Sequence, residues 1–125
     1  MKRLKLPLKQ REIDDLKIGE KLLLTGTLYT ARDAAHKRLV EAGEKGDILP
    51  INLENSAIYY VGPSPKKPNQ IIGSCGPTTS GRMDKYSPYL LDWGQKIIIG
   101  KGYRNRDVIE AIIRNKAVYL TAIGG

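Results

Sequence analysis

The chain has 125 residues, of which 41% are hydrophobic and 27% charged, values typical of one soluble globular domain. This size and composition exclude a disordered or fibrous protein and leave no room for a second domain. No apolar run approaches the roughly 20 residues of a membrane span, and the first residues lack the apolar region of a signal peptide. We therefore expect a single domain, residues 1–125, in a cytoplasmic protein that does not bind membranes.

The single cysteine limits the metal chemistry of the chain. Cys75 has no second cysteine with which to form an internal disulfide. A self-contained zinc or iron-sulfur site needs about three or four protein ligands, which one cysteine does not supply. We therefore expect no metal ligands on this chain.

The formal net charge of +8 raises the question of nucleic-acid binding, because Lys and Arg neutralise phosphates. The cations are spread along the chain, and no recognised nucleic-acid-binding motif accompanies them. The main cluster is N-terminal and consists of Lys2, Arg3, Lys5, Lys9 and Arg11. We expect no nucleic-acid partner, although a basic nucleic-acid-binding domain or a noncatalytic scaffold remains the alternative of another class.

The first strong elements are a strand at residues 21–30 and a helix directly after it. The strand is rich in leucine and β-prone residues. Thr30 is a suitable N-cap, and Asp33 follows three residues later as a capping-box partner. Apolar residues then recur at helical spacing until Gly43.

The middle of the chain alternates short strands with loops. Residues 57–61 predict a strand that ends at a proline-rich turn over 62–65, and Ile71 with Ile72 is a possible start of another. A small-residue loop over 73–81 leads into a helix that we expect to be interrupted near Pro88.

The last third predicts a strand, a helix and a final strand. Residues 97–99 are three isoleucines, typical of a buried strand in an α/β sheet, and Asn105 is a suitable N-cap for the helix that follows. Residues 117–123 predict the last strand. Strands alternating with helices predict an α/β fold, a single layered domain for which we expect a mixed sheet.

Three cations lie where the sequence places loop-to-helix junctions, namely Arg32, Arg82 and Lys101. A helix N-terminus favours an anion by about 0.3 to 1 kcal/mol, so cations there suggest that a separate anion binds. Two guanidinium groups suit carboxylates, and the ammonium of Lys101 adds a point charge. The alternative is that these cations pair with surface acids, and their spacing alone does not decide between the two.

Other polar residues are more ambiguous. The hydroxyls of Thr78, Thr79 and Ser80 are typical helix caps, although one of them could face a substrate. His36 lies within a predicted helix, where a structural or solvent-facing role is commoner than a catalytic one. The residues around Lys101 match neither a P-loop, whose spacing fails by one residue, nor a dinucleotide fingerprint.

Four motifs in order carry a family resemblance. They are GTLYTARDAAHKRL (26–39), YYVGPSP (59–65), GSCGPTTSGRMD (73–84) and IGKG (99–102). Over roughly residues 10–125 the chain resembles the C-terminal domain of class I fumarases and the β subunit of L(+)-tartrate dehydratase. Four ordered motifs are far more specific than any one of them.

The resemblance implies a swivelling β/β/α domain that acts as the β subunit of a hydro-lyase. Its partner would be an α subunit, in an α2β2 assembly, whose three cysteines bind a [4Fe-4S] cluster. The implied reaction is reversible hydration of fumarate to (S)-malate, with tartrate dehydration as the alternative. Family members usually continue past the glycines matching residues 124–125 with another helix and strands.

The resemblance also implies roles for individual residues. Arg32 and Arg82 would bind the carboxylates of a small dicarboxylate substrate, together with Thr79 and Gly81. Lys101 would stabilise charge, and Thr78 would lie at the reacting carbon as the proton-abstracting base. A threonine alkoxide needs nearby cations to exist at neutral pH.

Overall fold

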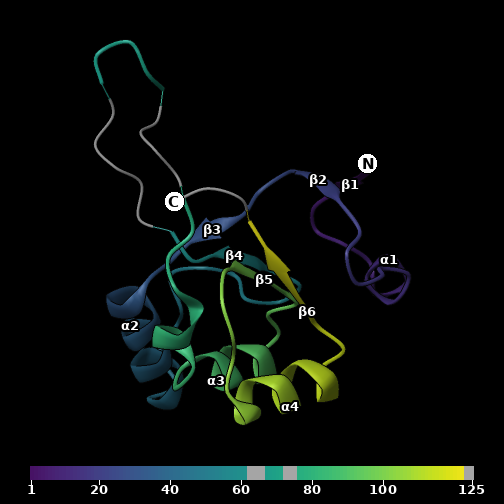
Figure 1. Ribbon diagram of the computed structural model, residues 1–125. Helices are drawn as coiled ribbons and strands as arrows, with labels where there is room; N and C mark the ends of the chain where they lie inside the picture. Colours follow the sequence, from purple (N-terminus) through teal and green to yellow (C-terminus); the bar gives the residue numbers. More distant parts are fainter. Residues whose placement is uncertain (62–66, 72–75, 123–125) are drawn as a thin grey trace.

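The computed structural model describes residues 1–61, 67–71 and 76–122, which form a layered α/β domain (Figure 1). The α/β class predicted from the sequence is confirmed. The elements in chain order are β1 (Lys2–Lys5), α1 (Gln10–Asp14), β2 (Leu22–Thr25), β3 (Tyr29–Thr30), α2 (Asp33–Glu44), β4 (Ala57–Tyr59), the 3-10 helix η1 (Ser80–Met83), α3 (Ser87–Asp92), β5 (Ile97–Gly100), α4 (Arg106–Arg114) and β6 (Val118–Thr121).

Two parallel sheets organise the described residues. The main sheet has the order β3-β4-β5-β6, and β1 pairs with β2 in a separate two-stranded sheet. All four strand pairings are parallel, so the expectation of a mixed sheet was wrong. The reason is that helical segments between successive strands of the main sheet return the chain to the edge where it started, which makes neighbouring strands parallel.

The main sheet is covered on both faces. Ile58, Tyr60 and Ile98 face a core shared with α2, α3 and α4. On the opposite face, Ala57, Ile97 and Ile99 pack with apolar residues of the N-terminal segment, namely Leu6, Leu8 and Ile13. Figure 1 shows the three longer helices on one side of the sheet and the β1, β2 and α1 unit on the other. Burial of both faces explains the uninterrupted isoleucine run of β5.

The strand predicted at residues 21–30 is two strands in two sheets. The break is at Gly26, whose φ of +120° favours glycine and where an added Cβ would lie 2.8 Å from the Leu6 carbonyl oxygen. β1, which the sequence did not predict, pairs with β2 from Lys2 opposite Leu22. A pairing between segments about twenty residues apart leaves no signal in local periodicity.

Helix starts depend on strand pairing as well as on local sequence. The prediction of Thr30 as an N-cap was wrong, because Thr30 pairs with Tyr59 as the last residue of β3 and the cap of α2 is Arg32. Pro88 lies in the first turn of α3 and does not interrupt it. The Asn105 cap is confirmed, since its side chain accepts a hydrogen bond from Val108 N at 3.0 Å.

Some predicted features lie outside the described residues. They are the turn at 62–65, Ile72, residues 73–75 of the small-residue loop including Cys75, residue 123 of the last predicted strand and the glycines at 124–125. Ile71 is described, and it is an exposed bend residue and not part of a strand. Among the described helices, none combines the length and the apolar character needed to cross a bilayer.

Candidate active site

The carboxyl edge of the main sheet gathers the residues that the sequence singled out. Arg32 lies two residues after β3, and Ala31 between them donates from its N–H to Tyr59 O at 3.1 Å. Lys101 follows directly after β5. Because the strands are parallel, both residues leave the sheet at the same edge, which is where open parallel sheets bind ligands.

The segment carrying Thr78 and Thr79 lies between the ends of β4 and β5. Thr78 N donates to Tyr60 O at 2.8 Å, just past β4. Thr79 forms a parallel bridge with Lys101, and Ser80 N donates to Lys101 O at 2.9 Å. The fold therefore brings Thr78 and Thr79 next to Lys101, which lies more than twenty residues later in the sequence.

Arg82 and Gly81 lie in η1, directly after this segment, and both are exposed. Their position changes the helix-dipole argument, because η1 is a four-residue 3-10 helix and Arg82 is in its last turn. Lys101 directly follows β5, well before α4 begins at Arg106. Arg82 and Lys101 therefore do not lie at helix N-termini as predicted, and only Arg32, the N-cap of α2, does.

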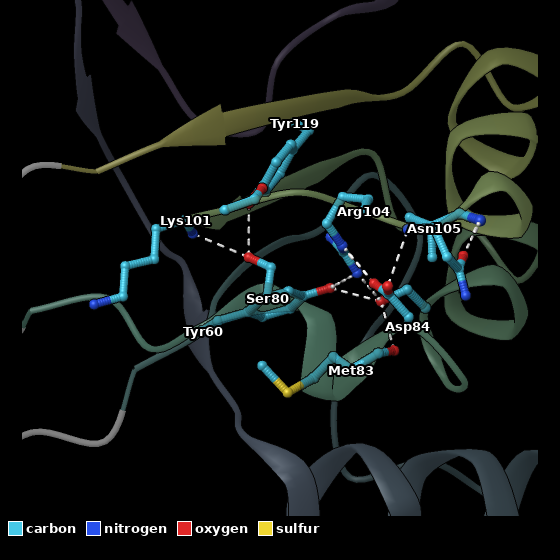
Figure 2. Close-up of polar contacts among 11 residues, drawn as sticks. Tyr60, Ser80, Met83, Asp84, Lys101, Arg104, Asn105 and Tyr119 are labelled. Atoms are coloured by element: carbon cyan, nitrogen blue, oxygen red, sulfur yellow. Dashed lines mark hydrogen bonds and ion pairs between the residues drawn. The ribbon is translucent and has the colours of Figure 1, made fainter.

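The three cations have no partners in the described part of the chain. Arg32, Arg82 and Lys101 are exposed, and no hydrogen bond or ion pair there uses their side chains. Figure 2 shows the Lys101 side chain extending away from the polar cluster around Ser80. Within residues 1–61, 67–71 and 76–122, none of the three cations pairs with a surface acid, so the alternative interpretation is wrong there.

The three hydroxyls of this segment differ in what they contact. Thr79 is the N-cap of η1 but makes no side-chain cap hydrogen bond, and the half-buried Thr78 hydroxyl has no partner among the described residues. Ser80 is fully buried, and its Oγ accepts from Lys101 N at 3.0 Å and lies 2.8 Å from the Tyr119 hydroxyl (Figure 2). The expected capping role was therefore wrong, and the Thr78 hydroxyl remains available to a ligand.

Sequence reasoning missed the polar residues beneath this edge. Asp84, Arg104 and Tyr119 bond to residues between 17 and 44 positions away in the chain. Arg104 stands only three residues after Lys101, in a loop that otherwise resembles an exposed basic turn. No local pattern distinguishes a buried arginine from a solvated one at such a place.

His36 has a structural role in α2, as expected for a histidine within a helix. Its ring is fully buried, and Nδ1 lies 2.9 Å from the Arg32 carbonyl oxygen. A carbonyl only accepts, so Nδ1 carries the proton, and Nε2 has no partner among the described residues. The ring meets Tyr60 edge-on at 5.0 Å. Burial is the main cause that lowers the pKa of His36 below its usual value of 6.5.

We expect His36 to make the protein less stable in acid. Below pH 6.5 the unfolded chain takes up a proton at His36 that the folded protein excludes, so the free energy of unfolding falls as pH falls. One such proton changes stability by at most about 1.4 kcal/mol per pH unit. Urea unfolding of wild type and His36→Gln between about pH 7 and pH 5 measures this. Identical pH dependence in the two proteins would contradict the prediction.

Metal-binding geometry is absent from the described residues. No group of three or more His, Cys, Asp or Glu side chains in the described ranges is placed to hold a metal ion. The polar groups at the sheet edge are cations and hydroxyls, which suit an anionic ligand and not a metal.

The profile of the family described as "Fumarase C-terminus" matches residues 1–125. The chain belongs to this family. Because the match covers the whole chain, it includes Arg32, Thr78, Arg82 and Lys101. The resemblance inferred from the four motifs is therefore confirmed.

Individual relatives of this Fumarase C-terminus chain are named as hydratases and dehydratases. "Fumarate hydratase 2" of Leishmania major is 37% identical over 117 residues, and "Fumarate hydratase class I, aerobic" of Escherichia coli K12 is 36% identical over 115. "Putative L(+)-tartrate dehydratase subunit beta" of Methanocaldococcus jannaschii is 36% identical over 121. These matches cover 93%, 91% and 94% of this chain. They span 21% of each fumarate hydratase and 62% of the Methanocaldococcus protein.

Proposed function

We propose that this chain forms one side of the active site of an iron-sulfur-dependent hydro-lyase that reversibly hydrates fumarate to (S)-malate. The observation that carries the proposal is a set of exposed cations around the carboxyl edge of the main sheet, Arg32, Arg82 and Lys101, whose side chains have no partner among the described residues. A small dianion is the ligand that such a set suits, because each carboxylate can meet a guanidinium or ammonium group. The named relatives act on substrates of this kind.

The guanidinium groups of Arg32 and Arg82 bind the two substrate carboxylates in this proposal. Thr79, the N-cap of η1, and Gly81 within η1 are both exposed. Backbone N–H groups near these two residues add hydrogen bonds to the carboxylate that Arg82 binds. Lys101 pairs with Thr79 in a parallel β-bridge, and its ammonium group stabilises negative charge that develops during the reaction. Binding both ends of the substrate fixes its orientation over the edge of the sheet.

Thr78 is the proposed proton-transfer residue. Its hydroxyl is half-buried and has no other partner among the described residues, and its backbone is fixed by the hydrogen bond to Tyr60 O. In the dehydration direction Thr78 Oγ1 removes the proton from the carbon next to a carboxylate, and in hydration it returns that proton. The adjacent Lys101 and Arg82 charges stabilise the alkoxide that this requires.

The [4Fe-4S] cluster belongs to a partner in this proposal. The chain has one cysteine, whereas such a cluster is held by cysteine thiolates, so the residues here do not fit as its ligands. A cluster with an open iron position supplies Lewis-acid chemistry to the substrate. Neither described hollow, of about 340 and 800 Å³, is lined by Arg32, Thr78, Arg82 or Lys101. An open half-site of this kind suits closure by an α subunit in an α2β2 assembly.

Tartrate is the second candidate substrate. The Methanocaldococcus protein, whose name refers to L(+)-tartrate, matches this chain at 36%, and the fumarate hydratases match it at 36–37%. Sequence identity to these relatives therefore does not favour fumarate or tartrate as the substrate. Both are four-carbon dicarboxylates that the same pair of arginines can bind, and the extra hydroxyl of tartrate lies between the carboxylates. A substrate panel on the assembled complex distinguishes them.

The chain alone is expected to bind no cluster and to leave malate unchanged. After anaerobic mixing with a cysteine-bearing α subunit, the complex is expected to gain iron and hydro-lyase activity. Iron analysis and the ultraviolet absorbance of fumarate measure the two outcomes. Stoichiometric iron on the isolated chain, or turnover without a partner, would refute the two-subunit proposal. A complex that assembles with its cluster but turns over neither malate nor tartrate would favour the noncatalytic scaffold.

A further inference from the structure

Arg104 is a buried cation that the proposed reaction does not use. Its side chain is only 2% exposed, although it lies in the loop between β5 and α4, three residues after Lys101. A buried charge destabilises a protein unless it is paired and hydrogen-bonded. The placement of Arg104 therefore needs an account beyond that of an ordinary loop residue.

Two hydrogen-bond partners of Arg104, Asp84 and Ser87, lie on the segment that follows Arg82, and a third, Tyr60, lies just past β4. Its Nε donates to Asp84 Oδ1 at 2.7 Å, and its Nη2 donates to Ser87 Oγ at 2.7 Å and to the Tyr60 hydroxyl at 3.2 Å. Nη1 is buried without a partner in the described residues. The guanidinium lies 5.2 Å from the ring centroids of Tyr60 and Tyr119, within the range of cation–π attraction. Figure 2 shows Tyr60 and Asp84 beside Arg104.

The Arg104–Asp84 pair joins two segments that carry proposed substrate-binding residues. Asp84 stands two residues after Arg82, and its second oxygen accepts from Asn105 N at 3.0 Å. One carboxylate therefore holds both Arg104 and the residue after it. A second connection between the same segments is the bond from Lys101 N to Ser80 Oγ. η1 and the loop after β5 are thus tied together both before and after Arg82.

We propose that Arg104 is a positioning residue, whose pairing with Asp84 fixes the spacing of Arg82 and Lys101 so that one dianionic substrate contacts both. This inference rests on the proposed function for its substrate. The geometry that supports it does not depend on the substrate, because the ion pair and its hydrogen bonds join residues of this chain to one another. The forked guanidinium is essential to the arrangement, since a lysine ammonium cannot reach Asp84, Ser87 and Tyr60 in the same geometry.

Amide hydrogen exchange on the full chain tests the connection without a substrate. In Arg104→Lys and in Asp84→Asn, the amides of Ser80, Lys101 and Asn105 are expected to exchange at least tenfold faster. The amide of Tyr60, which donates to Ile99 O within the sheet, is expected to keep its wild-type rate. Unchanged protection of Ser80, Lys101 and Asn105 in both folded variants would overturn the proposal.

Kinetics of the cluster-loaded complex test the consequence for the substrate. Arg104→Lys is expected to raise KM for malate at least tenfold while kcat falls less, because the carboxylate contacts are misplaced and the reacting groups are retained. The matched control is the exposed Arg114–Asp92 pair, which has two similar bonds of 2.8 and 2.9 Å at the far end of α4. Arg114→Lys is expected to keep wild-type KM. A purely structural role would lower stability and leave KM unchanged, which would overturn the proposal.

The two experiments separate this inference from the proposed function. A wild-type complex that turns over malate, together with an Arg104→Lys complex of wild-type KM, would refute positioning by Arg104 alone. Absence of turnover in the wild-type complex would refute the proposed function alone, because the exchange comparison needs no substrate.

Discussion

Arg82→Met in the cluster-loaded complex is expected to lower kcat/KM for malate by about ten- to a hundredfold, the effect of losing a charge-assisted contact to a carboxylate. Arg82 is exposed on η1 and has no ion-pair partner among the described residues, so its removal disrupts no described contact. Arg82→Lys is expected to have an intermediate effect, because the charge remains and the bidentate geometry is lost. Steady-state assays of malate dehydration measure both.

Arg114→Met is the control for this comparison. Arg114 is an exposed arginine in the last turn of α4, and its guanidinium donates to both carboxylate oxygens of Asp92. We expect the kcat/KM of the Arg114→Met complex to equal that of the wild-type complex. Wild-type kcat/KM in Arg82→Met, in a complex with full iron content, would show that Arg82 does not bind the substrate. Equal losses in the two variants would point instead to a general effect of removing positive charge.

Gly100→Ala is expected to destabilise the protein by about 1 to 3 kcal/mol, the usual effect of overpacking a buried site. A Cβ at position 100 would lie well inside van der Waals contact with Ser80 Oγ and 3.0 Å from Tyr60 Cδ2. Both neighbours are fully buried, so neither side chain has free space to move into. Urea unfolding measures the change in the free energy of unfolding.

Gly81→Ala is the matched control for stability, because an added Cβ there meets nothing within 4 Å and its φ is ordinary. It should leave the free energy of unfolding unchanged or slightly higher. The double variant Gly100→Ala/Ser80→Ala should lose less than the sum of its single variants, since the closest colliding atom is gone. Strict additivity, or a Gly100→Ala protein as stable as Gly81→Ala, would contradict this account of the packing.

Local patterns were reliable where a short segment determines its own structure. Asn105 caps α4 because its side chain reaches an amide three residues away, and that reach is a property of the local chain. The three isoleucines of β5 are buried on both faces, as such runs are in parallel sheets. The motifs around Arg32, Thr78, Arg82 and Lys101 were sufficient to identify the family, which the profile match confirms.

Predictions failed where strand pairing or distant contacts decided the outcome. Thr30 has the side chain of a helix cap, but its pairing with Tyr59 keeps it in a strand. Arg82 and Lys101 have the sequence context of helix starts, but η1 is a short 3-10 helix and Lys101 directly follows β5. The parallel direction of the sheet likewise depends on how each helix returns the chain across the sheet, which local propensity does not encode.

The sequence by itself determined which chemical groups the site contains: arginines, a lysine, threonine hydroxyls and too few cysteines for a metal cluster. Only the tertiary structure decided that these groups share one edge of a parallel sheet and that their charges are unpaired within the described residues. It also decided that Arg104, three residues from Lys101, is buried against Asp84. The physical reason is that residue type fixes charge and hydrogen-bonding capacity, whereas burial and pairing depend on segments that approach each other only when the chain folds.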